Sequence, residues 1–403
     1  MRDAATNAPP KPAQRIALFR VFLWLGLTSF GGPIAHISHF RREFVERRRW
    51  FTEEEYAGWV GLCQFLPGPA SSQLGFCLGM VRGGVPGAIA AFLGFTLPSA
   101  LFMGVLGGTM QFWTPESGRP LVHGLKLVAV AVVAHGVVTL GRRLCPDPVR
   151  GLLAVVVTGL ALGLDRPWIQ PLLIAGAAGV GAWACRGATA MTVEVGKLPY
   201  GRRGGIGCLI AFGFLVAVLP LLAMGRPGLL SVAAGFSRAG ALVFGGGHVV
   251  LPLLEDAVVR PGWVSQDDFL AGYGAAQAVP GPMFTLAAFL GARLSGSAGG
   301  WVGASIGVLS IFLPGLLLVA GVLPFWHGLT RSTSTARMMA GVNAGVVGLL
   351  AAALYDPVWT GAVRSWTDGV IAVAGFAALM TGRVPVLLVV LGCVVAGASF
   401  VSP

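Results

Sequence analysis

The sequence predicts an all-α membrane protein that crosses the bilayer many times and contains two repeated halves. Of its 403 residues, 55% are hydrophobic and only 11% are charged, whereas a soluble protein carries about 25% charged residues. Apolar stretches near the ~20 residues that span a bilayer follow one another along the chain. Several sequence motifs then occur a second time in the same order. These three observations together predict a polytopic membrane protein built from a repeat.

The apolar stretches form two groups. The first group lies at 16–35, 57–80, 84–111, 121–140, 151–164 and 168–185. The second group lies at 205–224, 230–252, 268–292, 297–322, 340–355, 366–381 and 384–400. We therefore expect four parts, namely a cytoplasmic leader (1–15), an N-terminal repeat (16–185), a basic linker with an extra transmembrane helix (186–229) and a C-terminal repeat (230–403).

Equivalent motifs are separated by a nearly constant offset, which changes from 214 between Phe30 and Phe244 to 217 between Lys126 and Asn343. Such a repeat indicates two structurally related bundles. The stretch at 205–224 has no counterpart in the first half. One extra crossing between two even-numbered halves would invert the second half relative to the first, so we predict an inverted repeat with a linker helix between the halves.

Two kinds of motif interrupt these stretches. Pro67-Gly68-Pro69 and Pro280-Gly281-Pro282 cannot continue a helix, because proline lacks an N–H group and clashes with the preceding turn. Gly31-Gly32-Pro33 and Gly245-Gly246-Gly247 are a second pair of breaks. Lipid tolerates a broken backbone only where protein or water covers it. A helix that restarts after a break also directs free N–H groups toward an anion. We expect broken or re-entrant helices at all four motifs.

Loop charge limits the topology. Five arginines lie between Arg41 and Arg49, whereas the equivalent loop of the second half has only Arg260 among acidic residues. If all thirteen stretches cross and the N-terminus is inside, the arginine-rich loop falls outside, against the positive-inside rule. If the four motifs are hairpins that enter and return, nine stretches cross and most arginines are cytoplasmic. We favour nine crossings, and both topologies place the C-terminus outside.

Candidate substrate-binding residues surround the breaks or carry charge within apolar stretches. They are Ser29, Gly31, Gly32, Gln64, Gly68, Ser71, Ser72, Gln73, Lys126, Arg238, Gly245, Gly246, Gln277 and Gly281. Backbone and hydroxyl donors at the breaks would bind an anion, and a basic residue inside the membrane is costly and usually functional. The alternative roles are helix capping for Ser71, Ser72 and Gln73, snorkelling for Lys126 and Arg238, and close packing for the glycines.

His36 and His248 follow the two glycine motifs, where a role in proton coupling or a structural hydrogen bond would suit them. The histidines do not form a metal-ligand cluster, and the six cysteines contain no C-x-x-C pair. We expect no metal and no cofactor. The net charge of +12 is typical of cytoplasmic-loop arginine in a membrane protein and does not indicate nucleic-acid binding.

The duplicated motifs resemble the chromate transporter (CHR) family in its long-chain, two-domain form. The resemblance rests on Ser29-Phe30-Gly31-Gly32-Pro33, Trp50 and Gln64…Pro67-Gly68-Pro69, with their second copies. It implies an inner-membrane carrier that exports chromate, is driven by the proton-motive force and confers chromate resistance. Sulfate would compete, because both ions are tetrahedral dianions. Gly247 and Asn343 depart from Pro33 and Lys126 of the first half, which indicates that the halves differ in role.

Other functions remain open at this point. The same scaffold could carry another substrate, such as sulfate, an organic acid or a lipid headgroup. A channel is compatible with the sequence, although duplicated broken helices favour a carrier. An enzyme is not expected, because the apolar stretches lack a nucleophile with its base or paired carboxylates, and no Walker A motif occurs. The expected partners are the oxyanion, protons and membrane lipid, and a homodimer is compatible with the sequence.

Overall fold

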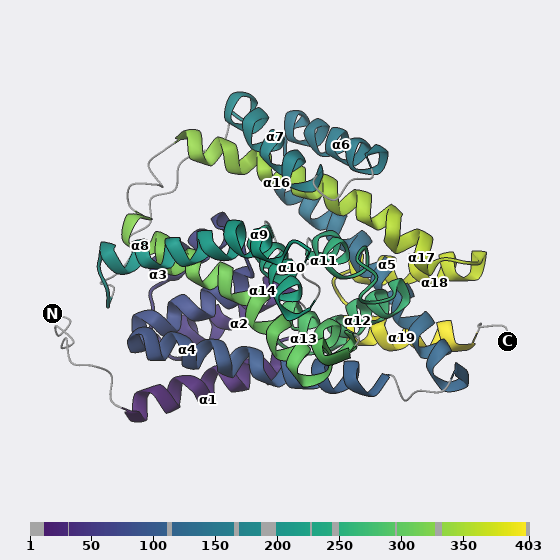
Figure 1. Ribbon diagram of the computed structural model, residues 1–403, viewed down its shortest axis with the longest axis horizontal. Coiled ribbons are helices and arrows are strands. Elements are labelled where there is room, and N and C mark those ends of the chain that lie inside the picture. The colour runs from purple at the N-terminus through teal and green to yellow at the C-terminus, as the bar shows by residue number, and fades with distance from the viewer. Residues whose placement is uncertain are drawn as a thin grey trace.

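The computed structural model describes residues 12–30, 32–110, 115–164, 169–186, 199–225, 228–243, 250–294, 296–326 and 333–399. Every regular element in these ranges is a helix. The helices pack into one bundle in which the two halves interleave (Figure 1). The all-α prediction is therefore confirmed.

The elements of the two halves follow the same order. The first half contains α1 (Pro12–Thr28), α2 (Gly32–Arg41), η1 (Arg42–Arg47), α3 (Glu53–Phe65), α4 (Ala70–Thr109), α5 (Pro115–Leu144), α6 (Pro148–Gly163) and α7 (Ile169–Ala184). The link contains α8 (Arg202–Gly213), η3 (Phe214–Val218) and α9 (Leu219–Ala223). The second half contains α10 (Leu229–Ala241), α11 (Val250–Val258), α12 (Gln266–Ala278), η5 (Met283–Thr285), α13 (Leu286–Arg293), η6 (Gly296–Ala298), α14 (Gly300–Val322), η7 (Leu323–Phe325), α16 (Thr333–Ala353), η8 (Leu354–Trp359), α17 (Thr360–Ala362), α18 (Trp366–Met380) and α19 (Val386–Ser399).

Equivalent helices begin at equivalent polar residues. Thr52 and Ser265 cap α3 and α12, and Asp147 and Ser365 cap α6 and α18. Each side chain accepts a hydrogen bond from a backbone N–H three residues further along, which satisfies one free donor of the first turn. At α6 the N–H of Arg150 holds the pKa of the Asp147 carboxyl below its ordinary value. Local capping chemistry is thus repeated in both halves.

The predicted breaks turn the chain back on itself. α1 and α2 fold against each other, so that the rings of Phe22 and Phe40 have centroids 5.6 Å apart. The next hairpin joins α3 to the first leg of α4. Its two ends also meet, because the guanidinium of Arg82 lies 4.9 Å from the ring centroid of Trp50. Each of these two hairpins therefore returns to the side from which it starts.

A further turn divides α4 into two legs. Gly84 has a φ of +61° inside this element. The chain reverses so sharply that a Cβ on Gly79 would lie 2.5 Å from the carbonyl oxygen of Gly87. Gly291 and Gly303 make the equivalent contact between α13 and α14. Only glycine leaves room for backbones this close, so this contact is preserved in both halves.

The second leg of α4 and its equivalent, α14, run antiparallel beside each other. The rings of Phe92 and Phe312 are 5.3 Å apart between centroids. Toward the other end, a Cβ on Gly104 would lie 3.1 Å from the ring of Trp301. Residue numbers thus rise along one helix and fall along the other. Two equivalent helices of opposite direction are the signature of an inverted repeat, as predicted.

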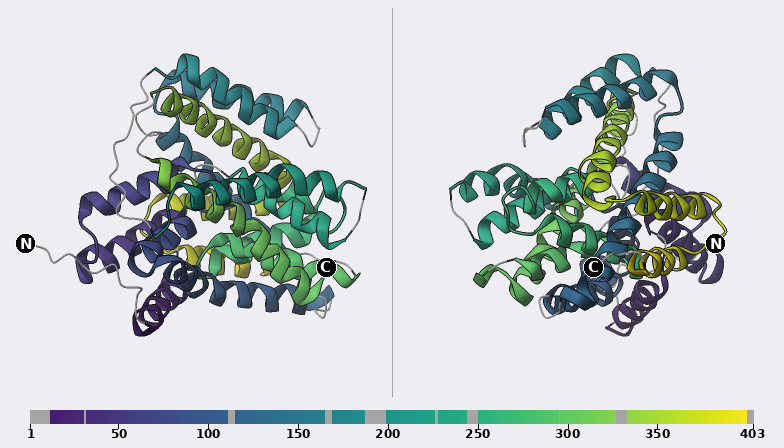
Figure 2. Two further views of the ribbon diagram at one scale, coloured as in Figure 1. Left: turned by 60° about the vertical axis from the view of Figure 1, so that its left-hand side comes forward. Right: turned by 90° about the vertical axis from the view of Figure 1, so that its right-hand side faces the viewer.

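Each half packs its last two helices on the other half. α6 and α7 pack on α16, whereas α18 and α19 pack on α5 (Figure 2). Equivalent glycines let these helices approach closely. Where α5 crosses α19, a Cβ on Gly124 would lie 2.5 Å from Val394 Cα. Where α16 crosses α7, Gly341 contacts the backbone oxygen of Ala177. Because of this exchange, neither half forms its own bundle without the other.

In the part of the chain that the structure describes, five helices are long and apolar enough to cross a membrane. They are Ala70–Thr109, Pro120–Leu144, Arg202–Ala223, Gly300–Phe325 and Thr333–Ala362. The shorter apolar helices are Pro148–Gly163, Ile169–Ala184, Met283–Arg293, Trp366–Met380 and Val386–Ser399. The linker helix is among the first five, which fits a crossing between two oppositely oriented halves.

Candidate functional site

Backbone hydrogen bonds between the halves hold the two proline breaks. The N–H of Gly68 donates to the carbonyl of Val243 over 2.7 Å, and the N–H of Gly281 donates to the carbonyl of Ser29 over 2.9 Å. Gly68 is equivalent to Gly281 in the repeat, and Ser29 is equivalent to Val243. Each proline break is therefore bonded to the residue just before the glycine motif of the opposite half, which is the reciprocal pattern of a pseudo-twofold axis.

Both breaks require glycine. Gly68 has a φ of +126° and Gly281 a φ of +100°, a region that other residues rarely adopt. A Cβ on Gly281 would lie 2.8 Å from the Ser99 hydroxyl, and one on Gly68 would lie 3.0 Å from Gly315 Cα. Ser99 and Gly315 are themselves equivalent in the repeat. The two proline breaks thus sit in matching, tightly packed surroundings.

Several buried polar atoms near these breaks have no hydrogen-bond partner among the described residues. They are Ser29 Oγ, His36 Nδ1, Ser72 Oγ, Gln73 Oε1 and Thr96 Oγ1. The other ring nitrogen of His36 lies 3.2 Å from the carbonyl of Ser29, and the ring meets Phe95 edge-on. Buried polar groups are nearly always hydrogen bonded. This group of unsatisfied atoms is therefore where a polar ligand would fit best.

The helix that restarts after the first proline break has an uncapped N-terminus. α4 begins after Pro69, and no side chain caps its first turn. Ser71 and Ser72 are buried in that turn, but their hydroxyls do not cap it. Helix N-termini attract anions through their free N–H groups and the helix dipole. This end of α4 combines such N–H groups with the unpartnered Ser72 hydroxyl.

Two glutamines fasten the first break to its surroundings. The Gln73 amide nitrogen donates to the carbonyls of Pro67 and Gly315, over 2.9 Å in each case. Both of its protons are therefore used within the protein. Gln64 accepts a 2.6 Å hydrogen bond from Arg143 at the end of α5. Arg143 has no local sequence feature that distinguishes it from a loop arginine, so sequence reasoning missed it.

The second break is satisfied locally. The Gln277 amide nitrogen lies 2.8 Å from the sulfur of Met283, and the Thr285 hydroxyl donates to the carbonyl of Pro282 over 2.8 Å. Neither group is left free. The side chains of the second break itself therefore leave no unpartnered donor, whereas the unpartnered hydroxyl of Ser72 follows the first break and that of Ser29 lies in the α1–α2 turn.

Lys126 is paired with a carboxylate of the opposite half. It is only 2% exposed, and its ammonium lies 2.6 Å from Asp267 in the first turn of α12. Asp267 also lies 3.6 Å from Arg364. α5 meets α12 a second time, where the Leu125 carbonyl contacts Gly274. The sequence identified Lys126 as a buried cation, but the partner is distant in sequence and no local pattern indicates it.

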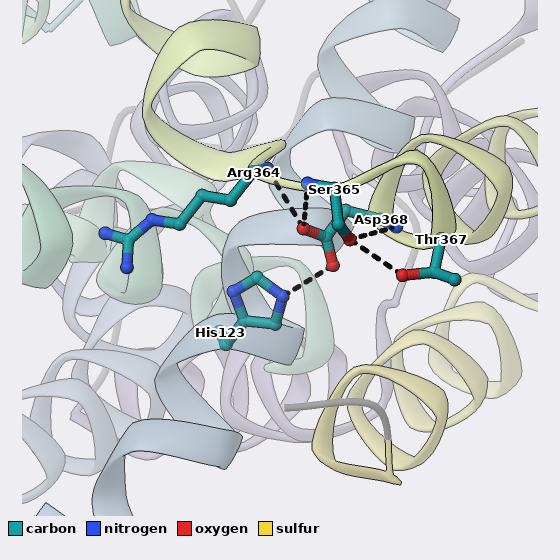
Figure 3. Close-up of polar contacts among 5 residues, drawn as sticks. All are labelled: His123, Arg364, Ser365, Thr367 and Asp368. Carbon is teal, nitrogen blue, oxygen red and sulfur yellow. Dashed lines mark hydrogen bonds and ion pairs between the residues drawn. The ribbon is translucent and has the colours of Figure 1, made fainter. Parts of the chain in front are cut away.

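His123, one turn before Lys126, forms a second link between the halves. Its Nε2 lies 2.7 Å from an oxygen of Asp368, in the first turn of α18. The other Asp368 oxygen accepts hydrogen bonds from the N–H groups of Arg364 and Ser365, each over 3.0 Å (Figure 3). Polar side chains of α5 therefore connect to both α12 and α18.

The remaining candidates lie apart or outside the described residues. Arg238 is partly exposed in the last turn of α10 and has no ion-pair partner among the described residues. Gly32 starts α2 with a φ of +77° and open space beside it. Gly31, Gly245, Gly246 and His248 lie outside the described residues. Within the described part of the chain, no group of three or more His, Cys, Asp or Glu residues could hold a metal ion.

Comparison with known proteins agrees with this architecture. The family described as "Chromate transporter" matches residues 16–182 and again residues 230–398. A chromate transport protein of Pseudomonas aeruginosa is 30% identical over 98% of this chain and 94% of its own length. A probable chromate transport protein of Synechococcus elongatus is 28% identical over 88% of this chain and 87% of its own length.

A third relative, a chromate transport protein of Cupriavidus metallidurans, is 25% identical over 86% of this chain and 83% of its own length. No solved structure matches the chain. The family match spans both halves and covers most of the sequence, as the duplicated motifs predict. The chain therefore belongs to the chromate transporter family.

Proposed function

We propose that this protein is a secondary transporter of the inner (plasma) membrane that exports chromate and thereby confers chromate resistance. The observation that carries the proposal is the group of unpartnered buried donors at the crossed breaks of two inverted halves. Secondary transporters bind substrate near the middle of the membrane, at broken helices between such repeats. Chromate, a tetrahedral dianion, would accept hydrogen bonds from hydroxyl groups and from the free N–H groups of a helix N-terminus.

The proposed binding residues lie around the first break and in the α1–α2 turn, where the Ser29 carbonyl is bonded to Gly281 of the second break. The hydroxyls of Ser29 and Ser72 and the first-turn N–H groups of α4 bind chromate oxygens. Lys126 and Arg238 contribute positive potential, although Asp267 offsets the charge of Lys126. His36 is the candidate for proton coupling, because one ring nitrogen is buried without a partner. Export is driven by the proton-motive force.

The two halves pack unequally, and this difference indicates a transport state. α5 packs along α12 through the Lys126–Asp267 pair, but the equivalent helix α16 makes no comparable contact with α3 among the described residues. The first-half hairpins pack in one hydrophobic core with the end of α14, and this core is separate from the core that contains α5 and the second-half hairpins. We infer a pathway that is closed beside Asp267 and open on the side of the arginine-rich loop.

The positive-inside rule assigns that arginine-rich side to the cytoplasm. The arrangement is then the inward-facing state, ready to accept cytoplasmic chromate. In the outward-facing state the two packing modes exchange, so that α16 packs on α3 while α5 leaves α12. Asn343 on α16, the equivalent of Lys126, has a buried and unpartnered amide oxygen. It would gain a partner in that state.

A counterflow experiment tests the substrate. Purified protein is reconstituted into liposomes that are loaded with unlabelled chromate, and tracer chromate is added outside. We expect transient tracer accumulation above protein-free liposomes, with inhibition by external sulfate. Exchange of sulfate or an organic acid without exchange of chromate would contradict the proposed substrate. Dissipation of a tracer gradient without counterflow would instead indicate a channel.

A further inference from the structure

The outer face of α1 contains an arginine where a membrane-facing helix normally has only apolar residues. Ile16, Trp24 and Leu27 are exposed on this face, with Trp24 61% exposed. Arg20 lies between them at helical spacing and is exposed as well. No described residue lies within ion-pair distance of Arg20. α1 runs along the edge of the bundle (Figure 1), so this stripe faces the lipid.

A basic groove opens beside this stripe. It is an open cavity of about 540 Å³ between α1 and η1, lined by Ala17, Arg20, Val21, Trp24, Glu43, Arg47 and Arg48. Glu43 pairs with Arg47 over 3.1 Å and with Arg48 over 2.5 Å. One carboxylate faces three guanidinium groups, so the groove keeps an excess of two positive charges.

We propose that this groove binds the headgroup of an anionic phospholipid. The phosphate would lie against Arg20 and Arg47, and the acyl chains would follow Trp24 and Leu27 along α1. Tryptophan and arginine are the residues that membrane proteins place at the headgroup level. A basic pocket at the cytoplasmic surface, where the arginine-rich loop is expected, suits an anionic headgroup. The apolar half of the groove argues for a lipid over a free anion.

This site is separate from the crossed breaks and does not depend on the proposed function. It requires only that α1 faces lipid on the arginine-rich side. The arrangement also differs from the second half, where Arg238 occupies the position equivalent to Trp24. A lipid at this groove would therefore bind one half of the repeat and not the other.

Thermal unfolding of the purified full-length protein tests the site. Detergent solutions are supplemented with phosphatidylglycerol, with phosphatidylcholine or with inorganic phosphate. We expect phosphatidylglycerol alone to raise the unfolding temperature. In the double variant Arg20→Gln/Arg47→Gln the apparent affinity for phosphatidylglycerol should fall about thirty-fold, or about 2 kcal/mol at about 1.4 kcal/mol per tenfold.

Arg142→Gln is the matched control, because Arg142 is an exposed arginine at the end of α5 that does not line the groove. It should retain the affinity of the wild type. Equal affinity of the double variant and the wild type would overturn the proposal. If inorganic phosphate stabilises the protein as much as phosphatidylglycerol does, the groove binds a free anion and not a lipid. If phosphatidylcholine stabilises it equally, the groove does not recognise the negative charge of the headgroup. Native mass spectrometry of retained lipid provides a second measurement if the variants differ in basal stability.

Discussion

Gly68 and Gly281 set the geometry where the halves meet. Both donate a backbone hydrogen bond to the opposite half and both have positive φ. A side chain at either position would strain the backbone and press on the facing segment. The sequence alone indicates these glycines, because proline on each side excludes a continuous helix. The interface is thus specified by a few residues whose backbone conformation is unusual.

The substitution Gly281→Ala should destabilise the protein and impair transport. Its Cβ would lie 2.8 Å from the Ser99 hydroxyl, and a residue held at this φ costs about 1–3 kcal/mol. Thermal unfolding and chromate counterflow would measure the two effects. Gly392→Ala is the control, because Gly392 is exposed in α19 with nothing within 4 Å of a Cβ. An unfolding temperature and a transport rate for Gly281→Ala equal to those of Gly392→Ala would contradict this account.

The substitution Ser72→Ala should weaken chromate binding without loss of stability. The hydroxyl is buried and unpartnered, so its removal sacrifices no internal hydrogen bond. A hydrogen bond to a charged ligand contributes about 1.5–3 kcal/mol, and we expect affinity to fall about ten- to hundred-fold. Equilibrium binding of labelled chromate measures this change. Ser399→Ala, which removes a hydroxyl bonded to Val395, should bind normally. Affinity within two-fold of the wild type would exclude Ser72 from the site.

Sequence reasoning reached these residues unequally. Ser72 could be proposed as a donor because it follows a proline break. Its lack of a partner depends on side chains far away in sequence. Lys126 was recognisable as a cation in an apolar stretch, but Asp267 lies 141 residues away. Arg143 looked like an ordinary loop arginine. Local patterns identify which residues are unusual, and tertiary contacts decide what each one touches.

At the scale of helices, α5 connects the two halves. It packs on α12, α18 and α19, and its Lys126 and His123 pair with carboxylates on two of them. In the proposed transport cycle, in which α5 and α16 exchange their packing, these contacts would stabilise closure on one side of the membrane. Their loss should therefore change both stability and the preferred transport state.

The substitution Asp267→Asn should destabilise the protein by about 2–3 kcal/mol. It leaves the buried Lys126 ammonium without its charged partner, and the cost is below that of a fully buried pair because Asp267 is half exposed. Denaturant or thermal unfolding measures this loss. The double variant Lys126→Met/Asp267→Asn should recover most of the stability, since no unpaired charge remains. If the stability loss of the double variant equals the sum of the losses in Asp267→Asn and Lys126→Met, the two residues are not coupled.

The helical elements were largely predictable, but their partners were not. The proline and glycine motifs indicated the breaks, and the turn at Gly84 directly follows the gap between stretches 57–80 and 84–111. No sequence pattern indicated that α6 and α7 pack on α16 of the second half, or that α18 and α19 pack on α5 of the first half. Gly124 and Gly341 indicate that some helix approaches closely, and the sequence does not say which one.

At the scale of the molecule, the inverted repeat makes opposite ends of equivalent helices face opposite sides. Arg47 and Arg364 have side chains exposed by 69% and 67% and lie toward the two proposed sides. In a background without reactive native cysteines, Arg47→Cys should react with a membrane-impermeant maleimide only from the cytoplasmic side. Arg364→Cys should react only from the outside. Reaction of both sites from the same side would rule out the nine-crossing, inverted topology.

The most direct test of the central claim is chromate uptake into everted inner-membrane vesicles that contain this protein. Everted vesicles expose the cytoplasmic face, so an exporter accumulates substrate inside them. The account predicts energy-dependent accumulation of labelled chromate that collapses with a protonophore and falls with excess sulfate. Accumulation no greater than in vesicles without the protein, with the protein shown to be folded and inserted, would contradict the claim that it exports chromate by the proton-motive force.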